Sequence, residues 1–586
     1  MTRVAILSIL AFSNLLCYAD CQEAKSTSKE EQIKIAIIGG GVSGNFAAKY
    51  LSDYDTKCLF DITIFEAPPD DVHDQGSRVA SSVLEDGTIV ELGASIIYDG
   101  NKLVNEMTSG DENLEKDTPH SPGRALSNEE KSQLRKGMAL FQGLEKEKKW
   151  AFNTANMASD EIISLFKYRY NIDLYKVRKA TNQALESFNL IYDLLDSNHE
   201  ATFFDSPNDI WRAVGLSHAA SVSYDDYLDY LGVSRHVSWW KRIFGEQGIL
   251  RSELHTAMNI CNNNQLNSQM TGLAGLVNSA AAMGKLFSIK GGNDKLLQSA
   301  YNQAKEKHDT YCRKKDMYGE SMIRKEMKRI KTFVSNFDAG TELFDGGGKS
   351  IGTFDIVILA APLQFSGINF LGKGSMFDSS VLHSISLNEM VDSENSDANE
   401  HGHKAALGSH LPSSATRPYT QVVTTIISNA KLNHSEISLE KDQIPGSILF
   451  TETGRESLGI SSIGQISGDV YKIFSSEELS RDTVTKLFGL EAKIDIVKIW
   501  GGKNGGATPA FNGAGEASFS TRFKLYDGGH GASSYADGAA LYYTNAMESA
   551  VSAIEISAIG AKMVAKLVAR QFNLIQSQST SQSDEL

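Results

Sequence analysis

The sequence predicts an α/β protein. We expect a discontinuous Rossmann-like nucleotide-binding domain and an interleaved second domain that contains helices and a mixed sheet. Three observations carry this prediction. A short apolar run near the N-terminus leads into a glycine-rich turn, a second apolar run around residues 354–361 stops at a proline, and a third at residues 541–543 precedes a long apolar helical pattern. Because these pieces are hundreds of residues apart, we expect one sheet to be assembled from both ends of the chain.

The first piece has the order of a dinucleotide-binding unit. Residues 33–38 read as a buried parallel strand, the turn GGGVSG follows, a helical pattern comes next, and a second strand at residues 60–65 ends at an acid. In such a unit the glycines and the acid each have a physical role. We assign the tight turn to Gly39, close approach of the backbone to a pyrophosphate to Gly41, close packing of helix and sheet to Gly44, and acceptance of a ribose hydroxyl to Glu66.

The returning pieces are expected late in the chain. Residues 354–361, ending before Pro362, read as a strand, and so do residues 541–543. An apolar helix is predicted from Ala550 to about Val568, with its N-terminus toward the electron-rich edge of the bound cofactor.

The middle of the chain predicts helices. Apolar residues recur at helical spacing over residues 163–177 and again over residues 184–195, and aromatic residues are frequent from Trp211 to Trp240. We expect a helical substrate domain around an apolar cavity. The mixed charges of residues 111–149 predict a solvated helix and loop.

Two further motifs indicate the cofactor. Gly76-Ser77-Arg78 and Glu91-Leu92-Gly93-Ala94-Ser95 resemble the GG-R and E-x-G-x-S elements of amine-oxidase-like flavoproteins, with Ser77 in place of the second glycine. The resemblance implies FAD as the cofactor, with Arg78 at the pyrophosphate and Gly93 and Glu548 in the cofactor site.

Across nearly its whole length the chain also resembles the prenylcysteine oxidases, or prenylcysteine lyases, within that superfamily. The resemblance rests on residues 287–296 (FSIKGGNDKL), 421–425 (QVVTT), 472–475 (KIFS) and 541–559. Tyr98 stands where the family has His, residues 262–265 (NNNQ) replace an Asn-Tyr-Gly-Gln-like run, and Ala507-Thr508-Pro509 stands near an expected Ala-Tyr-Pro.

The implied reaction is oxidative cleavage of S-prenyl-L-cysteine, either farnesyl- or geranylgeranyl-cysteine, by water and O2 to cysteine, a prenyl aldehyde and hydrogen peroxide. Because the flavin carries this chemistry, no acid–base pair is assigned. Gln265 and Tyr98 are the candidates for the flavin's reactive face. Two alternatives stay open: an amine or amino-acid oxidase of the same superfamily, and a non-catalytic prenyl-lipid-binding protein of the same fold.

Composition and termini bear on partners and location. The 586 residues carry a net charge of −15, which disfavours nucleic acid and anionic membranes as partners, and no internal run reads as a transmembrane segment. Residues 1–19 have the pattern of a signal peptide. The terminal Ser583-Asp584-Glu585-Leu586 favours retention in the endoplasmic reticulum, with lysosome or vacuole as the alternative. Asn433-His434-Ser435 is a glycosylation sequon. The spacing of the five cysteines leaves disulfide pairing open.

We expect the following organisation along the chain. A linker follows the signal peptide at 20–32, and three cofactor-domain segments lie at 33–110, 281–365 and 539–575. A mainly helical substrate-domain segment lies at 111–280, and a second substrate-domain segment lies at 366–500. That second segment has a disordered insertion near 390–415, and a Gly-rich loop at 501–538 and a polar tail at 576–586 complete the chain. His401, His403 and His410 fall in the insertion, and no metal site is predicted there.

Overall fold

The computed structural model describes most of the chain after the leader. The described residues are 32–68, 77–119, 124, 126–146, 149–236, 248–313, 322–336, 340–362, 368–373, 383–386, 419–501, 508–511, 522–527 and 540–575. The predicted signal peptide, the insertion with its three histidines, Gly76, most of the Gly-rich loop and the polar tail lie outside these residues.

A six-stranded sheet collects strands from both ends of the chain, with the order β10-β2-β1-β14-β25-β24. The first five are parallel neighbours and β24 is antiparallel to β25. The strands are β1 (Ile33–Ile38), β2 (Phe60–Glu66), β10 (Ile323–Met327), β14 (Ile356–Leu359), β24 (Lys524–Asp527) and β25 (Ala540–Tyr543). The predicted strands at 33–38, 60–65 and 541–543 are confirmed. The one expected from Phe354 begins at Ile356, because Phe354 ends the preceding strand β13 (Ser350–Phe354).

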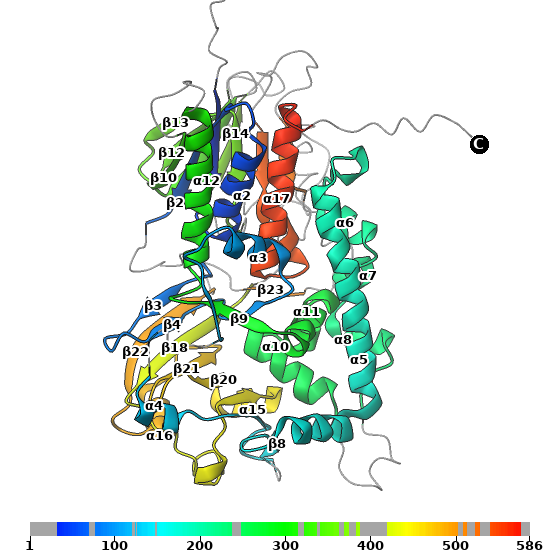
Figure 1. Cartoon of the computed structure of the whole chain (residues 1–586), viewed down its shortest axis with the longest axis vertical. Coiled ribbons are helices and arrows are strands. Elements are labelled where there is room, and N and C mark those ends of the chain that lie inside the picture. Colours follow the sequence, from blue (N-terminus) through cyan, green and yellow to red (C-terminus); the bar gives the residue numbers. More distant parts are fainter. Residues whose placement is uncertain are drawn as a thin grey trace, which may run out of the picture.

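Three helices stand beside this sheet (Figure 1): α2 (Val42–Tyr54), α12 (Lys295–Arg313) and α17 (Ile554–Gln571). α2 lies between the other two and confirms the helix predicted after the glycine turn. The late helix begins four residues after Ala550. Residues Thr544–Ser549, which precede the predicted start, form a largely buried 3-10 turn, and Ala553 is extended (φ −155°, ψ 158°) before α17 starts.

A seven-stranded sheet forms the lower left of Figure 1, with the order β22-β18-β21-β20-β19-β7-β8. Its strands are β7 (Met138–Phe141), β8 (Trp150–Asn153), β18 (Val422–Ser428), β19 (Ser447–Phe450), β20 (Ile460–Gln465), β21 (Tyr471–Ser475) and β22 (Lys493–Trp500). The expectation of a solvated helix and loop over residues 111–149 is therefore wrong for its last part. Ala139, Leu140 and Phe141 are buried because β7 pairs with β19.

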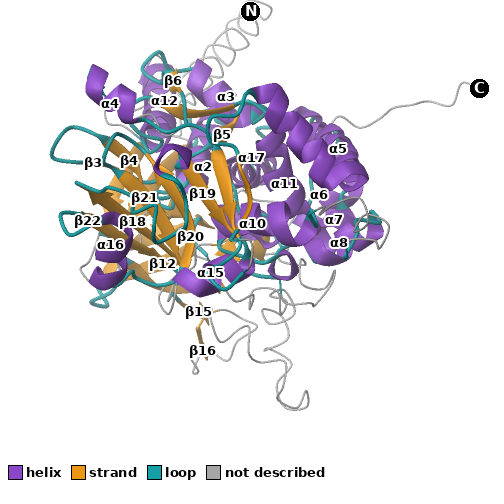
Figure 2. Ribbon diagram, turned by 90° about the horizontal axis from the view of Figure 1, so that it is seen from below, coloured by secondary structure: helices purple, strands orange, loops and turns teal. Residues whose placement is uncertain are grey.

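Helices occupy the opposite side (Figures 1 and 2). They are α5 (Ser159–Asp196), α6 (Pro207–Ala213), α7 (Ser217–Ser221), α8 (Tyr224–Tyr230), a π-turn at Arg251–His255, α10 (Thr256–Asn263) and α11 (Gly272–Met283). The helical patterns predicted over 163–177 and 184–195 both fall in α5, which consists of two helical segments joined at a kink where the backbone of Asn171 is not helical (φ 46°, ψ −124°). No helix in the described ranges is long and apolar enough to cross a membrane.

Smaller elements complete the fold. A five-stranded sheet has the order β13-β12-β11-β15-β16, and short ladders join β5, β9 and β6, β3 and β4, and β17 and β23. Their bounds are β3 (Ser81–Val83), β4 (Ile89–Glu91), β5 (Ile97–Tyr98), β6 (Lys116–Asp117), β9 (Leu286–Ile289), β11 (Ile330–Asn336), β12 (Gly340–Asp345), β15 (Asn369–Lys373), β16 (His383–Ser386), β17 (Tyr419–Thr420) and β23 (Thr508–Pro509). The remaining helices are α3 (Lys102–Ser109), α4 (Asn128–Gln133), α15 (Glu452–Leu458) and α16 (Arg481–Phe488).

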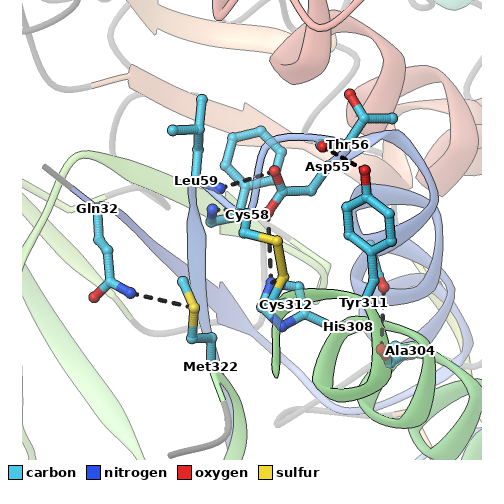
Figure 3. The surroundings of a disulfide bond; sticks show 12 residues. Gln32, Asp55, Thr56, Cys58, Leu59, Ala304, His308, Tyr311, Cys312 and Met322 are labelled. Carbon is cyan, nitrogen blue, oxygen red and sulfur yellow. Dashed lines mark hydrogen bonds and ion pairs between the residues drawn. A yellow bond between two sulfur atoms is a disulfide. The ribbon is translucent and has the colours of Figure 1, made fainter. Parts of the chain in front are cut away.

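A disulfide fastens α12 to the first strands of the six-stranded sheet. Cys58, just before β2, is bonded to Cys312 near the end of α12, 254 residues later (Figure 3). Beside it the Asp55 carboxylate accepts hydrogen bonds from the backbone N–H groups of Leu59 and Phe60, both at 2.9 Å. His308 lies 3.5 Å from the same carboxylate. The bridge therefore closes a very long loop inside an already ordered corner.

Candidate cofactor and substrate site

The glycine turn between β1 and α2 requires two of its glycines for its own packing. Gly39 has φ +114°, and a Cβ there would lie 2.8 Å from the carbonyl oxygen of Ala360. A Cβ on Gly44 would overlap the carbonyl oxygen of Gly39. Only glycine allows this close approach of helix, turn and neighbouring strand. These two glycines therefore allow α2 to pack closely against the sheet.

Gly41 and Glu66 point instead to a bound group. A Cβ on Gly41 would meet nothing closer than the Ser77 hydroxyl at 3.6 Å, so the protein's own packing does not require glycine there. Glu66, at the end of β2, is packed against Gly40, and its buried carboxylate oxygen Oε2 has no hydrogen-bond partner among the described residues. Burial raises the pKa of this carboxyl group, and Lys325 and a hydrogen bond from the backbone N–H of Gly40 oppose the rise. A carboxylate with one oxygen still able to accept, beside an open glycine, fits a ribose hydroxyl next to a pyrophosphate.

Arg78 and Glu548, predicted for the same site from opposite ends of the chain, form an ion pair. Arg78 also donates to the Ser552 hydroxyl at 3.2 Å, and the Tyr419 hydroxyl lies 3.5 Å from Glu548. The pair joins the loop after β2 to the 3-10 turn before α17. It thereby fixes the N-terminal approach to α17 beside Arg78.

The loop at residues 91–95 is held by a long-range carboxylate bridge. Glu91 accepts hydrogen bonds from the backbone N–H of Asn293 and from the Ser81 hydroxyl, both at 2.8 Å. The Asn293 amide donates back to the carbonyl oxygen of Ala94 at 2.9 Å. A Cβ on Gly93 would overlap the carbonyl oxygen of Arg78. Glu91, Gly93 and Asn293 are therefore needed to shape this loop.

Three strands of the seven-stranded sheet, β18, β21 and β22, hold the same loop from the other side. The Thr424 hydroxyl and the Trp500 indole N–H donate to the carbonyl oxygen of Leu92 at 2.7 and 2.9 Å. The Lys472 ammonium donates to the Ser95 hydroxyl. Burial lowers the pKa of Lys472 to about 8, although the nearby Glu91 opposes the shift. Three sequence stretches that look unrelated along the chain thus converge on residues 91–95.

This loop forms one wall of a cavity of about 640 Å³. The other walls come from α5, α10, α11, β19–β21 and residues 551–556, and most of the lining side chains are apolar. Polar side chains that line the cavity include Lys472, Asn262 and Glu555. The cavity therefore places an apolar volume directly beside the loop at residues 91–95, as a site for an apolar small molecule requires.

Glu555 closes the wall where α17 begins. It is 3% exposed, and its carboxylate accepts hydrogen bonds from the backbone N–H groups of Leu103 and Val104 and from the Tyr192 hydroxyl, at 2.8, 3.1 and 2.8 Å. Burial raises the pKa of Glu555 to about 7. Because it accepts from the first turn of α3 and from Tyr192 of α5, this residue ties the start of α17 to both helices, and α5 and residues 551–556 are two of the cavity walls.

The two predicted flavin-face residues lie in different places. Tyr98 lines the cavity, on β5. Gln265 is buried behind α10, where its amide donates to the carbonyl oxygen of Pro509 at 3.0 Å, and its neighbours Asn262 and Asn263 line the cavity instead. Sequence reasoning missed Lys472 and Glu555 as cavity residues. Both stand in stretches that carried the family resemblance, which was the available signal.

The described residues combine a Rossmann-like sheet with an apolar cavity, and the family and relatives of the chain make it an oxidoreductase of the flavoprotein type. The chain belongs to the prenylcysteine lyase family, whose family model matches residues 155–381 and 403–584. Prenylcysteine oxidase 1 of Pongo abelii is 24% identical over 585 residues, covering 97% of this chain and 95% of the relative. Prenylcysteine oxidase 1 of Homo sapiens is 24% identical over 589 residues, with the same coverage.

A solved structure was also found to be similar. Cyclohexylamine oxidase from Brevibacterium oxydans IH-35A matches with a TM-score of 0.48 and 14% identity, covering 92% of this chain and all of that chain.

Proposed function

We propose that this protein is a FAD-dependent thioether oxidase that converts S-prenyl-L-cysteine, water and O2 into cysteine, a prenyl aldehyde and hydrogen peroxide. The observation that carries the proposal is the apolar cavity of about 640 Å³ whose wall is the loop at residues 91–95. Membership of the prenylcysteine lyase family supports the choice of substrate class.

The residues present fit FAD. Gly41 leaves the backbone open to a pyrophosphate, the unpaired Glu66 oxygen would accept from the adenosine ribose, and Arg78, oriented by Glu548, would face the phosphates. When bound, FAD supplies the hydride acceptor and is returned to its oxidised form by O2, which becomes hydrogen peroxide.

The protein's own contribution is position and dryness. The apolar walls from α5 and α11 would hold the prenyl chain and exclude bulk water from the reacting carbon, the allylic carbon bonded to sulfur. Loss of hydride from that carbon leaves a cation that the sulfur and the allyl system stabilise. Water then adds, and the hemithioacetal breaks its carbon–sulfur bond to give aldehyde and thiol.

Lys472 would stand at the reacting end, since it lines the cavity and contacts Ser95 of the cofactor-side loop. A buried ammonium favours negative charge close to it and disfavours the cation that hydride loss creates, so the neutral amine is the form of Lys472 that suits this step. The position of Lys472 in the cavity wall distinguishes the proposed reacting end from the apolar remainder of the cavity.

The test is product stoichiometry. Purified protein supplied with farnesylcysteine in air should release aldehyde, free thiol and hydrogen peroxide in equal amounts, and geranylgeranylcysteine should behave in the same way. Release of ammonia without thiol would show amine or amino-acid oxidation instead, and binding without any product would show a prenyl-lipid-binding protein.

We also propose a location in the secretory pathway. The Cys58–Cys312 disulfide supports it, because such bonds persist in oxidising compartments. The terminal Ser-Asp-Glu-Leu favours the endoplasmic reticulum, with lysosome or vacuole as the alternative. Cell fractionation of the full chain, with and without these four residues, distinguishes the compartments.

A further inference from the structure

Lys472 is a cation in the cavity wall whose hydrogen bond and ring contact are both made to uncharged groups. It is 5% exposed, and among the described residues that line the cavity it is the one cation. Its ammonium donates to the Ser95 hydroxyl and lies 4.5 Å from the ring centroid of Phe474. An ammonium has three donors, so a single hydroxyl leaves it under-satisfied. Among the described residues its charge therefore has no counter-ion in direct contact.

The titratable groups nearest to Lys472 do not supply that counter-ion. Glu91 favours the charged form of Lys472 from a distance, but its carboxylate already accepts from the Asn293 N–H and the Ser81 hydroxyl. The other neighbour is the Cys261 thiol, and burial raises its pKa, so it is uncharged near neutral pH. A buried charge without a direct partner is costly. An anionic group that enters the cavity at Lys472 would therefore be bound favourably.

We propose that Lys472 binds the α-carboxylate of the cysteine part of the substrate and so selects thioethers that carry a free carboxylate. This inference deepens the proposed function and rests on it. Four bonds separate the allylic carbon from the carboxylate carbon, a reach of about 5 Å in an extended chain. A carboxylate on Lys472 would therefore hold the reacting carbon near the loop at residues 91–95 and leave the prenyl chain to the apolar walls.

The pairing also agrees with the charge that hydride loss creates on the substrate. An ammonium alone would repel that cation, whereas an ammonium paired with a carboxylate carries no net charge and meets the same requirement as the neutral amine. Because an anion favours the charged form of a lysine, a bound carboxylate should raise the pKa of Lys472 above its value of about 8. Binding at a pH above that value should therefore take up a proton.

The experiment compares two probes of the same shape on the full, FAD-loaded protein by titration calorimetry. The probe 3-(dodecylthio)propanoate keeps the spacing of sulfur and carboxylate found in cysteine and has neither an allylic carbon nor an amine. The probe 3-(dodecylthio)propanamide is its uncharged counterpart. At about pH 7 the carboxylate should bind tenfold or more tightly than the amide, about the lower bound for a buried charge pair. At about pH 8.5, in buffers of different ionisation enthalpy, its binding should take up about three-quarters of a proton.

One variant and a matched control assign the effect to Lys472. In Lys472→Met the two probes should bind with affinities within about threefold of each other, and no proton should be taken up. The control is Lys498→Met, which makes the same change at a partly buried lysine of β22 outside the cavity wall. It should prefer the carboxylate as the unchanged protein does. The flavin spectrum and thermal melting verify that each variant is loaded and folded.

Equal affinity of the unchanged protein for the two probes would overturn the carboxylate site, and so would a preference that survives in Lys472→Met. The first of these comparisons needs no variant. In turnover, Lys472→Met should raise the KM for farnesylcysteine about tenfold or more relative to the KM for its methyl ester. A protein that prefers the carboxylate probe and turns over no prenylcysteine would overturn the proposed function and leave the carboxylate site supported.

Discussion

Two alanine substitutions in the same glycine turn separate the packing of the fold from the binding of the cofactor. In Gly44→Ala the new Cβ overlaps the carbonyl oxygen of Gly39, and backbone atoms cannot rotate away. In Gly41→Ala the nearest atom is the Ser77 hydroxyl at 3.6 Å, an ordinary contact, and φ at Gly41 is −75°, which alanine adopts freely.

The expected magnitudes differ accordingly. Gly44→Ala should destabilise the cofactor-free protein by about 3 kcal/mol, the upper range for an overpacked core. Gly41→Ala should change it by less than about 1 kcal/mol, as expected for a helix N-cap position. For FAD affinity, Gly41→Ala should be the more damaging of the two substitutions, because its methyl group occupies the space proposed for the pyrophosphate. A tenfold or greater loss of FAD affinity is expected, equivalent to about 1.4 kcal/mol or more.

The assay is urea unfolding of each variant without FAD and with saturating FAD, because a ligand that binds only the folded state adds stability in proportion to the logarithm of its concentration over Kd. Gly41→Ala should unfold like the unchanged protein without FAD and lose part of the gain that FAD provides. Equal destabilisation of both cofactor-free variants, or an undiminished FAD gain in Gly41→Ala, would refute the assignment of Gly41.

Three further predictions concern other parts of the structure. Replacing Cys58 and Cys312 by serine should lower the unfolding free energy by about 2–5 kcal/mol, measured by urea unfolding, and a reducing agent should have the same effect on the unchanged protein. Burial raises the pKa of Glu555 to about 7 from 4.5, so the folded state holds this proton more tightly than the unfolded state does. The free energy of unfolding should therefore fall as pH rises from about 4.5 to 7, by up to about 3 kcal/mol. In Glu555→Gln the free energy of unfolding, measured by urea unfolding, should change less over this pH range. Burial lowers the pKa of Lys472 to about 8, so the rate of flavin reduction should inflect near pH 8 in the unchanged protein; an identical profile in Lys472→Met would show that this ammonium has no part in the reaction.

The local units of the fold were predictable because each is written in consecutive residues. Strand, glycine turn, helix, strand and Glu66 occupy residues 33–66 and follow one another as the physics of a dinucleotide-binding unit requires. The kink that divides α5 at Asn171 was not predictable from spacing, because apolar periodicity continues through it. Strand β7 was not predicted either, because four residues are too few to show a strand periodicity. Its residues are buried because β7 pairs with β19, which lies far away in the sequence.

The site was predictable in its parts and not in its assembly. Glu91 and Asn293 are 202 residues apart, and Lys472 lies 377 residues from Ser95, so no local pattern relates them. Each belonged to a stretch that resembled the family, yet resemblance does not say which stretches touch. The same holds for the Cys58–Cys312 pair, which depends on where α12 ends against β2. Gln265 shows the converse, since its neighbour Asn262 faces the cavity while Gln265 itself turns to Pro509.

The central claim is that the apolar cavity beside the loop at residues 91–95 holds a prenyl thioether against a bound flavin. The most direct measurement is the absorption spectrum of the purified, FAD-loaded protein under anaerobic conditions. Addition of farnesylcysteine should bleach the flavin band in a single turnover, and admission of O2 should restore it with release of hydrogen peroxide. A protein that stays colourless when supplied with FAD, or a flavin that farnesylcysteine leaves oxidised while an amine reduces it, would contradict the account.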